Sequence, residues 1–457
     1  MNLETKETTV QKRIDKALKL VDTTRFVIIG CGAIECVSKY LKEYFNGKTA
    51  LIVADTNTNI AAGITVMEHL RSSGYPVIQP MIYECTNLYA EMQYVEQLQH
   101  HLSGNSVVPI AVGSGTINDI TKLAAGRCGL PYITVPTAAS MDGYTAFGAS
   151  ISYKGAKQTF NCAAPLVVIA DINIIAAAPN ELNAAGYADL IAKIPSGADW
   201  IIADALEIEP IHTQAWNLTQ THIRDLVSTP SGIYSGDKDA IIRLMEGLIM
   251  TGLGMQASKT SRPASGAEHQ FSHLWDNQHH TFKGAIPYHG FKVGIGSLAS
   301  EALYEKILLR DKSDFETDEK KITGQQLPFN EIEKQIQRHF HDKYLANQAI
   351  EQCKAKYIGS KELADRIRLL KSIWPELKSH LAKQLLGALK MKQMLADAGA
   401  PVNPEDIGIS RQLLKLSYEQ AQLIRKRYTI LDLVSETGLW KTCVDPLFMK
   451  GGFWFEE

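Results

Sequence analysis

Short apolar runs alternate with stretches of helical periodicity from about residue 25 to residue 172. Near-continuous apolar runs are typical of strands that are buried on both faces of a sheet. The stretches between them, such as residues 34–46 and 88–102, are long enough for crossover helices. This alternation predicts an α/β domain with a parallel sheet and helices on both faces. The runs are FVIIG, TALIVAD, PVIQPMIY, VVPIAVG, PYITVPT and LVVIADI.

The pattern changes after Pro179, where strand-like runs stop and helical periodicity continues almost to the end of the chain. We therefore expect two domains, an α/β domain of residues 1–178 and an all-α domain of residues 179–457. Residues 310–327 are dense in charge and weakly periodic, which predicts a solvated loop in the second domain.

Composition and charge exclude several classes of partner. A formal net charge of −2 gives no general attraction to nucleic acid or to an anionic membrane, so we expect a small-molecule substrate. The first twenty residues mix acids and bases without an apolar core, which argues against a signal peptide. Seven scattered cysteines without a CxxC pair predict free thiols in a reducing cytoplasm.

Two glycine loops are candidates for a nucleotide phosphate site. The first, Gly30-Cys31-Gly32, has Glu35 at the third glycine position of the dinucleotide fingerprint, where a carboxylate would repel a pyrophosphate. Gly30 and Gly32 are therefore predicted to form a tight turn only. Asp55 ends the next predicted strand, where it can accept ribose hydroxyls, and its charge favours NAD over NADP.

The second loop lies between the run VVPIAVG and a predicted helix, so it is the better candidate for the pyrophosphate site. A phosphate site in this position makes the predicted domain Rossmann-like. Glycines let backbone amides approach a phosphate, and neighbouring hydroxyls can donate to it. A glycine turn capped by Ser or Thr is an equally common explanation of such a loop taken alone. The residues are Gly113, Ser114, Gly115 and Thr116.

The next strand-like run ends in VPTAASMDGYTAF, at the same edge of the predicted sheet. Asp142 there is expected to face the ligand, although an Asp-Gly pair is otherwise an ordinary turn. The small residues before it are expected to lie against a flat nicotinamide. They are Thr137, Ala138, Ala139 and Ser140.

Three side chains are candidates for one metal site. Asp189 lies in an apolar segment where a buried carboxylate needs a strong partner, either a cation or Lys193 four residues later. His269 and His289 add two imidazoles, and such a set suits zinc, nickel or ferrous iron while leaving positions for a substrate oxygen. His273, one helical turn after His269, is expected to lie beside the metal without binding it. Two unrelated helix histidines are the alternative explanation.

Taken together, five segments resemble the iron-containing alcohol dehydrogenase and dehydroquinate synthase superfamily, and within it the AraM-like sn-glycerol-1-phosphate dehydrogenases. They recur in the same order and cover about residues 112–296. The resemblance implies a dehydroquinate synthase-like fold. The segments are GSGTINDITK, PTAASMDGYTAF, GYADLIAK, SRPASGAEHQFSH and YHGFKVGIG.

The resemblance also implies roles for individual residues. Asp142 and His273 would contact substrate, Asp189, His269 and His289 would bind the metal, and residues 137–140 would contact the nucleotide. The family often has a hydroxyl residue where Ala146 stands, so that nucleotide contact is missing or comes from Thr145. The NAD(P) phosphates would lie on Gly115, Thr116, Ile117, Asn118 and Asp119.

These residues lead to a hypothesis about function. A zinc, nickel or iron ion would polarise the carbonyl of dihydroxyacetone phosphate as a Lewis acid, so that NADH or NADPH reduces it to sn-glycerol 1-phosphate. His273 would relay the proton. The expected assembly is a homodimer.

The substrate phosphate needs cations or amides. Lys193 and Arg262 are candidates, and so are the amides of residues 265–267, because Ser265 and Glu268 predict a capping box at a helix start. The alternatives are a polyol dehydrogenase that ignores phosphate, a lyase of the dehydroquinate synthase type, and a nucleotide-binding sensor without catalysis.

Overall fold

The computed structural model describes residues 3–85, 88–154, 156–316 and 318–455. Contacts divide the chain into two compact units. Unit 1 comprises Met1–Ile191, Thr213–Ala264 and Asp397–Ala400, and unit 2 comprises Ala192–His212, Ser265–Ala396 and Pro401–Glu457. The predicted boundary after residue 178 stays a prediction.

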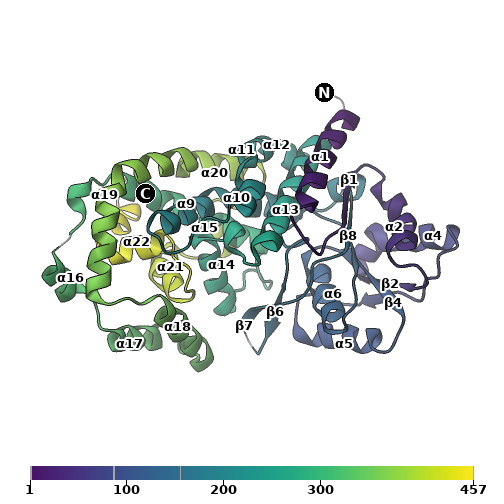
Figure 1. Ribbon diagram of the computed structural model, residues 1–457, viewed down its shortest axis with the longest axis horizontal. Helices are drawn as coiled ribbons and strands as arrows, with labels where there is room; N and C mark the ends of the chain where they lie inside the picture. Colours follow the sequence, from purple (N-terminus) through teal and green to yellow (C-terminus); the bar gives the residue numbers. More distant parts are fainter. Residues whose placement is uncertain (1–2, 86–87, 155, 317, 456–457) are drawn as a thin grey trace. The chain divides into compact units, whose positions relative to one another are not determined.

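Unit 1 is built around a six-stranded parallel sheet, whose strands β1, β8, β4 and β2 are labelled in Figure 1. The strand order is β1-β8-β5-β4-β2-β3. Every residue of β4 and β8 is buried, which explains their continuous apolar sequences. This sheet confirms the predicted α/β domain. The strands are β1 (Phe26–Gly30), β2 (Thr49–Asp55), β3 (Met81–Tyr83), β4 (Val107–Gly113), β5 (Ile133–Pro136) and β8 (Val167–Asp171).

Helices cover both faces of this sheet. Side chains of α2 (Val37–Tyr44) and α4 (Ile64–Ser72) form one apolar layer with the sheet. Side chains of α5 (Met92–Leu102) and α6 (Gly115–Arg127) form the layer on the other face. The helix after β2 and the helix after β4 therefore lie on opposite faces, although β2 and β4 are neighbours.

Unit 1 contains further elements outside the main sheet and its covering helices. The helix α1, the hairpin of β6 and β7 and the short helix α7 were not predicted, whereas the helices from α8 onward follow Pro179, where the periodicity predicts helices. The strands β6 and β7 form an antiparallel hairpin that is separate from the main sheet. The elements are α1 (Leu3–Leu18), β6 (Ala149–Tyr153), β7 (Ala156–Phe160), α7 (Ile172–Ala176), α8 (Asn180–Ile191), α10 (Thr213–Gln220), α11 (Ile223–Leu226), α12 (Pro230–Tyr234) and α13 (Lys238–Ser258).

Unit 2 is helical throughout the part that the structure describes, as the periodicity after Pro179 predicts. The predicted loop over residues 310–327 was wrong in part, because α16 (Glu319–Gln325) forms there after Asp318, whose carboxylate caps it. The other helices are α9 (Lys193–Ala205), α14 (Ala267–Asn277), α15 (His289–Leu308), α17 (Phe329–His339), α18 (Lys343–Lys356), α19 (Ser360–Gln384), α20 (Ala388–Asp397), α21 (Arg411–Leu423), α22 (Ile430–Glu436) and α23 (Trp440–Cys443). Among the described residues, no helix has the length and apolar character that crossing a bilayer requires.

Candidate functional site

The carboxyl ends of β2 and β4 mark the point where the helix connections change face. Open parallel sheets bind ligands at such switch points, outside the carboxyl ends of the strands. β2 and β4 pair in parallel up to Val53 and Ala111, so Asp55 and Gly113 end neighbouring strands at this edge. The two residues with the clearest predicted nucleotide roles therefore lie on adjacent strands.

The second glycine loop joins β4 to α6 here. Ser114, Gly115 and Thr116 are partly exposed, whereas the strand before them is buried. Ser114 is the N-cap of α6, but its side chain does not cap the helix. Among the described residues, no side chain bonds the amides of Gly115 and Thr116, so they are available to an anion. Gly113 must be small, because a Cβ there would lie 2.6 Å from Cβ of Ile117.

The first glycine loop differs in that carboxylates of the chain already bind its amides. The amide of Cys31 donates to Glu7 Oε1 at 3.0 Å, and Gly32 and Ile34 donate to the Asp171 carboxylate at 3.2 and 3.1 Å. Gly32 has φ +73, which favours glycine. These contacts support the predicted structural role of this loop.

Asp55 performs a structural task that the sequence did not predict. Its Oδ1 accepts from the amide of Thr58 at 2.9 Å, and its own amide donates to Thr58 Oγ1 at 3.0 Å. This capping box starts the short helix α3 (Thr56–Thr58). Oδ2 has no hydrogen-bond partner among the described residues, so one oxygen is left for a ribose hydroxyl.

The remaining predicted nucleotide residues of α6 point into the domain. Ile117 is buried, Asn118 accepts from the Tyr132 hydroxyl at 3.1 Å, and Asp119 accepts from the amide of Ser150 at 3.2 Å. Burial raises the pKa of the Asp119 carboxyl.

The segment after β5 is held against α8 by contacts that the sequence did not reveal. The amide of Ala139 donates to Asn183 Oδ1 at 2.9 Å. A Cβ on Gly186 would lie 1.7 Å from the Ala139 carbonyl oxygen, so glycine is required for this close approach. Thr137 and Ala138 are buried with Ala139.

Ser140 and Thr145 make contacts within unit 1. The Ser140 hydroxyl lies 3.2 Å from that of Tyr144, and Thr145 is fully buried and donates to the Ile249 carbonyl at 2.8 Å. Asp142 is buried, and its amide donates to Asp189 Oδ2 at 3.0 Å. The turn after β5 thus orients the carboxylate that we predicted as a metal ligand.

The predicted metal ligands come from three helices, α8, α14 and α15. Asp189 is fully buried on α8, and His269 and His289 lie with their ring centroids 5.3 Å apart. One ligand atom of each of these three residues lies within 4.8 Å of the others. The His273 ring lies 6.1 Å from that of His269 and 6.2 Å from that of His289.

Neighbouring side chains orient both imidazoles. Nδ1 of His269 lies 2.8 Å from Glu268 Oε1, and Nδ1 of His289 lies 3.3 Å from Ser272 Oγ. A ring held at Nδ1 presents Nε2 as the metal-binding nitrogen, an arrangement common around bound metals. Glu268 is fully buried, and its Oε2 has no hydrogen-bond partner among the described residues, so its charge favours a nearby cation. The donor set therefore fits a divalent metal.

The start of α14 differs from the predicted capping box. Gly266, not Ser265, is the N-cap, and its amide donates to Glu268 Oε1 at 2.6 Å. The amide of Ala267 donates to Asp199 Oδ2 at 2.7 Å. Since carboxylates already bind these two amides, they are unsuited to a substrate phosphate. The other two candidates, Lys193 and Arg262, are both fully buried.

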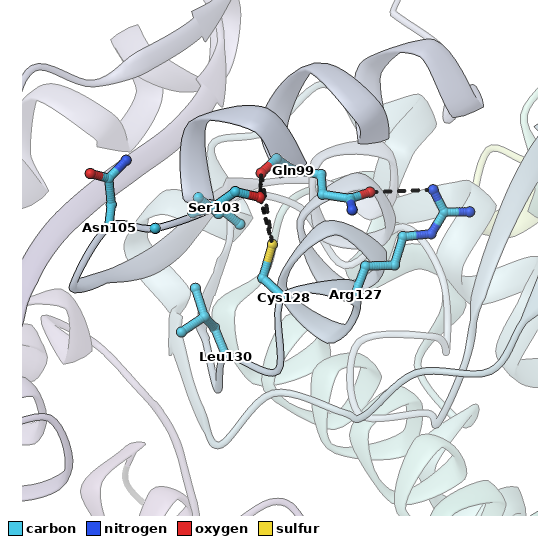
Figure 2. A pocket seen from close by; sticks show the side chains of 8 residues that line it. Gln99, Ser103, Asn105, Arg127, Cys128 and Leu130 are labelled. Atoms are coloured by element: carbon cyan, nitrogen blue, oxygen red, sulfur yellow. Dashed lines mark hydrogen bonds between the residues drawn. The ribbon is translucent and has the colours of Figure 1, made fainter.

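A surface pocket lies between the ends of α5 and α6 (Figure 2). Its side chains bond one another, since Arg127 donates to Gln99 Oε1 at 3.4 Å and Ser103 donates to the Gln99 carbonyl at 2.8 Å. Its residues precede β4 and β5, so it lies at the amino ends of these strands and is not the expected ligand edge.

Known proteins resemble this chain in sequence and in fold. The sequence pattern of the iron-containing alcohol dehydrogenases matches residues 13–179. The chain is 36% identical over 271 residues to an NAD(P)+ glycerol-1-phosphate dehydrogenase of Halalkalibacterium halodurans, covering 58% of this chain and 68% of the relative. It is 30% identical over 413 residues to the NAD(P)+ glycerol-1-phosphate dehydrogenase of Bacillus velezensis, and the match covers 90% of this chain and 91% of the relative.

Solved structures show the same fold at low identity. A probable glycerol dehydrogenase from Sinorhizobium meliloti gives a TM-score of 0.58 at 14% identity, covering 93% of this chain and 98% of that one. The glycerol dehydrogenase of Schizosaccharomyces pombe gives a TM-score of 0.57 at 16% sequence identity, and the match covers 92% of each chain. The predicted fold class and resemblance are confirmed. The chain belongs to the glycerol-1-phosphate dehydrogenases of the iron-containing alcohol dehydrogenase family, which are metal- and NAD(P)-dependent oxidoreductases.

Proposed function

We propose that this protein interconverts dihydroxyacetone phosphate and sn-glycerol 1-phosphate, with a divalent cation held by Asp189, His269 and His289. The observation that carries the proposal is the grouping of one carboxylate and two imidazole ligand atoms within 4.8 Å of one another. Such a set suits zinc, nickel or ferrous iron. The relatives named for this activity support the substrate class.

When bound, the cation would supply Lewis acidity at the carbonyl or alkoxide oxygen of the substrate, and the nicotinamide would supply or accept the hydride. The residues of the chain keep the ligands in place. Glu268 and Ser272 hold the two imidazoles at Nδ1, and the amide of Asp142 holds Asp189. Ligands fixed in this way need no rearrangement when substrate binds.

His273 is the proposed proton carrier. It is half-buried beside the other two imidazoles, and an imidazole can both donate and accept a proton, as transfer to or from a substrate hydroxyl requires. Asp142 is proposed to contact the substrate as well.

The nucleotide is proposed to bind at the second glycine loop, with its pyrophosphate on the amides that begin α6. Residues 113–116 and 137–140 remain its proposed contacts, whereas Ile117, Asn118, Asp119 and Thr145 are buried in unit 1 and would support the loop from within. Asp55 Oδ2 would accept a ribose hydroxyl and disfavour a 2′-phosphate. The substrate phosphate is proposed to contact Lys193 and Arg262, because both side chains are buried cations and a cation binds a dianion more strongly than a neutral amide does.

NADH oxidation tests the proposed function. Metal-stripped protein is reconstituted with zinc, nickel or iron and assayed with dihydroxyacetone phosphate and with dihydroxyacetone. We expect the phosphorylated ketone to have a higher kcat/KM by about two orders of magnitude or more, since binding a phosphate by charged groups contributes several kcal/mol. Equal values would support a polyol dehydrogenase instead. Turnover without a net change in NADH absorbance would support a lyase, and NADH binding without turnover would support a sensor.

His273→Ala tests the proton carrier. We expect kcat to fall by about 10²-fold or more, as for loss of a general acid or base, while zinc affinity is kept. The matched control is His341→Ala, which removes an exposed histidine of unit 2. Wild-type kcat/KM in His273→Ala would remove His273 from the mechanism.

A further inference from the structure

Lys122 is a fully buried lysine on α6, and its ammonium group donates hydrogen bonds to the turn at residues 143–148. Its Nζ donates to the carbonyls of Gly143, Ala146 and Gly148 at 2.6, 3.0 and 3.2 Å. A lysine ammonium has three N–H donors, so these bonds account for all of them.

The nearest carboxylate is a weaker partner than this turn. Asp119 Oδ1 lies 3.8 Å from Lys122 Nζ, which is beyond hydrogen-bond distance, and its Oδ2 accepts from the amide of Ser150. Burying an ammonium is costly unless it is well bonded. The three carbonyls therefore explain the position of Lys122 better than the ion pair does.

The turn that Lys122 binds is next to the residue whose amide donates to Asp189. Gly143 follows Asp142, and the amide of Asp142 donates to Asp189 Oδ2. The hydrogen bonds thus link Lys122 through the turn to a proposed metal ligand, all within unit 1.

We propose that Lys122 is a positioning residue for the metal centre. By binding three carbonyls of the turn at residues 143–148, it keeps the amide of Asp142 on Asp189 and fixes that carboxylate for the cation. Groups that orient a ligand in this way typically change metal affinity or activity by about 10- to 100-fold when they are lost. This inference rests on the proposed function, because it needs Asp189 to be a ligand.

The turn has other anchors, which makes a test feasible. Gln256 Nε2 donates to the Thr145 carbonyl and the Thr145 hydroxyl donates to the Ile249 carbonyl. These bonds hold the far side of the turn, so loss of Lys122 should loosen the turn without unfolding the domain.

The experiment distinguishes two roles that Lys122 could have, which are to hold the turn at residues 143–148 and to neutralise the Asp119 carboxylate. The reference is Asp119→Asn, and the test variant is Asp119→Asn/Lys122→Met, which leaves no unpaired buried charge. The zinc dissociation constant is measured by chelator competition without nucleotide, and thermal unfolding of the metal-free proteins checks the fold. We expect the double variant to bind zinc about 10- to 100-fold more weakly than the reference. Equal affinity would overturn the proposal, since neutralisation alone predicts that result.

A milder double variant, Asp119→Asn/Lys122→Gln, replaces the test variant if that one does not fold. Its amide can still donate to one carbonyl, so we expect an intermediate loss of zinc affinity, and an unchanged affinity would again overturn the proposal. Asp189→Ala identifies the cause of a failure. If it binds zinc as the wild type does, both the proposed function and this inference fail. If it loses zinc while the double variants bind like the reference, only the role of Lys122 fails.

Discussion

The two glycine loops of unit 1 look alike in sequence and differ in structure. Both follow a strand of the parallel sheet and both precede a helix. In the first loop, carboxylates of Glu7 and Asp171 accept from the amides of Cys31, Gly32 and Ile34. In the second loop, the amides of residues 115 and 116 have no side-chain partner among the described residues.

The difference shows that glycine spacing alone does not identify a phosphate site. A loop whose amides already bind carboxylates has no donors left for a pyrophosphate, and the carboxylates would also repel it. The loop at the switch point keeps its donors available. The following changes test this contrast.

Gly113→Ala should have the largest effect of these changes, and the effect should be on NADH affinity. The added Cβ would lie 2.6 Å from Cβ of Ile117, so the first turn of α6 must shift. A displacement of about 1 Å can cost about 10²-fold in a positioned site, and we expect NADH affinity to fall on that order. The control is Gly32→Ala, which strains a residue with φ +73 and should lower stability by about 1 kcal/mol at unchanged NADH affinity. Fluorescence titration with NADH compares them, and an equal loss in both variants would contradict the contrast.

Asp171→Asn should destabilise the first loop and the start of α7 without affecting the nucleotide site. The carboxylate accepts from three amides, those of Gly32, Ile34 and Asn173, and an amide side chain would place an N–H group against one of them. We expect the free energy of unfolding in urea to fall by about 2 kcal/mol, because hydrogen bonds to charged groups are involved. NADH affinity should stay at the wild-type value, and a parallel loss of binding would assign the nucleotide to this loop.

Asp55→Asn should change coenzyme preference by a smaller amount. Asparagine keeps the cap on Thr58 but removes the negative charge that repels a 2′-phosphate. We expect the ratio of kcat/KM for NADPH to that for NADH to rise about tenfold, equivalent to about 1.4 kcal/mol. An unchanged ratio would show that Asp55 acts only as a helix cap.

Glu7→Gln should have the smallest effect. Glutamine keeps an acceptor for the amide of Cys31, so we expect less than about 1 kcal/mol of lost stability. The number of NADH molecules bound per chain should remain one. A second equivalent would show that charge alone kept the nucleotide from the first loop.

Strands buried on both faces were predictable because burial on both sides leaves a continuous apolar run. The runs TALIVAD and VVPIAVG coincide with β2 and β4. The run PVIQPMIY forms only the three-residue β3, which lies at the edge of the sheet. The hairpin β6–β7 was missed because its sequence lacks a strong turn dipeptide and half of the residues in its strands are polar.

The predicted site residues were identified from local sequence, but their supports were not. The capping box at Ser265 was wrong because Asp199, which is far away in the sequence, binds the amide of Ala267. Lys122 and Gly186 matter through contacts with turns that lie elsewhere in the chain. Such long-range contacts leave no periodic pattern in the sequence.

Zinc titration of the metal-stripped protein tests the central claim most directly. The comparison is between the wild type, the three single variants Asp189→Ala, His269→Ala and His289→Ala, and the control His341→Ala. We expect the wild type and the control to bind one zinc ion per chain, and each of the three variants to bind it at least about 100-fold more weakly, because each loses a ligand. Wild-type zinc affinity in any of the three variants would contradict the proposed metal centre.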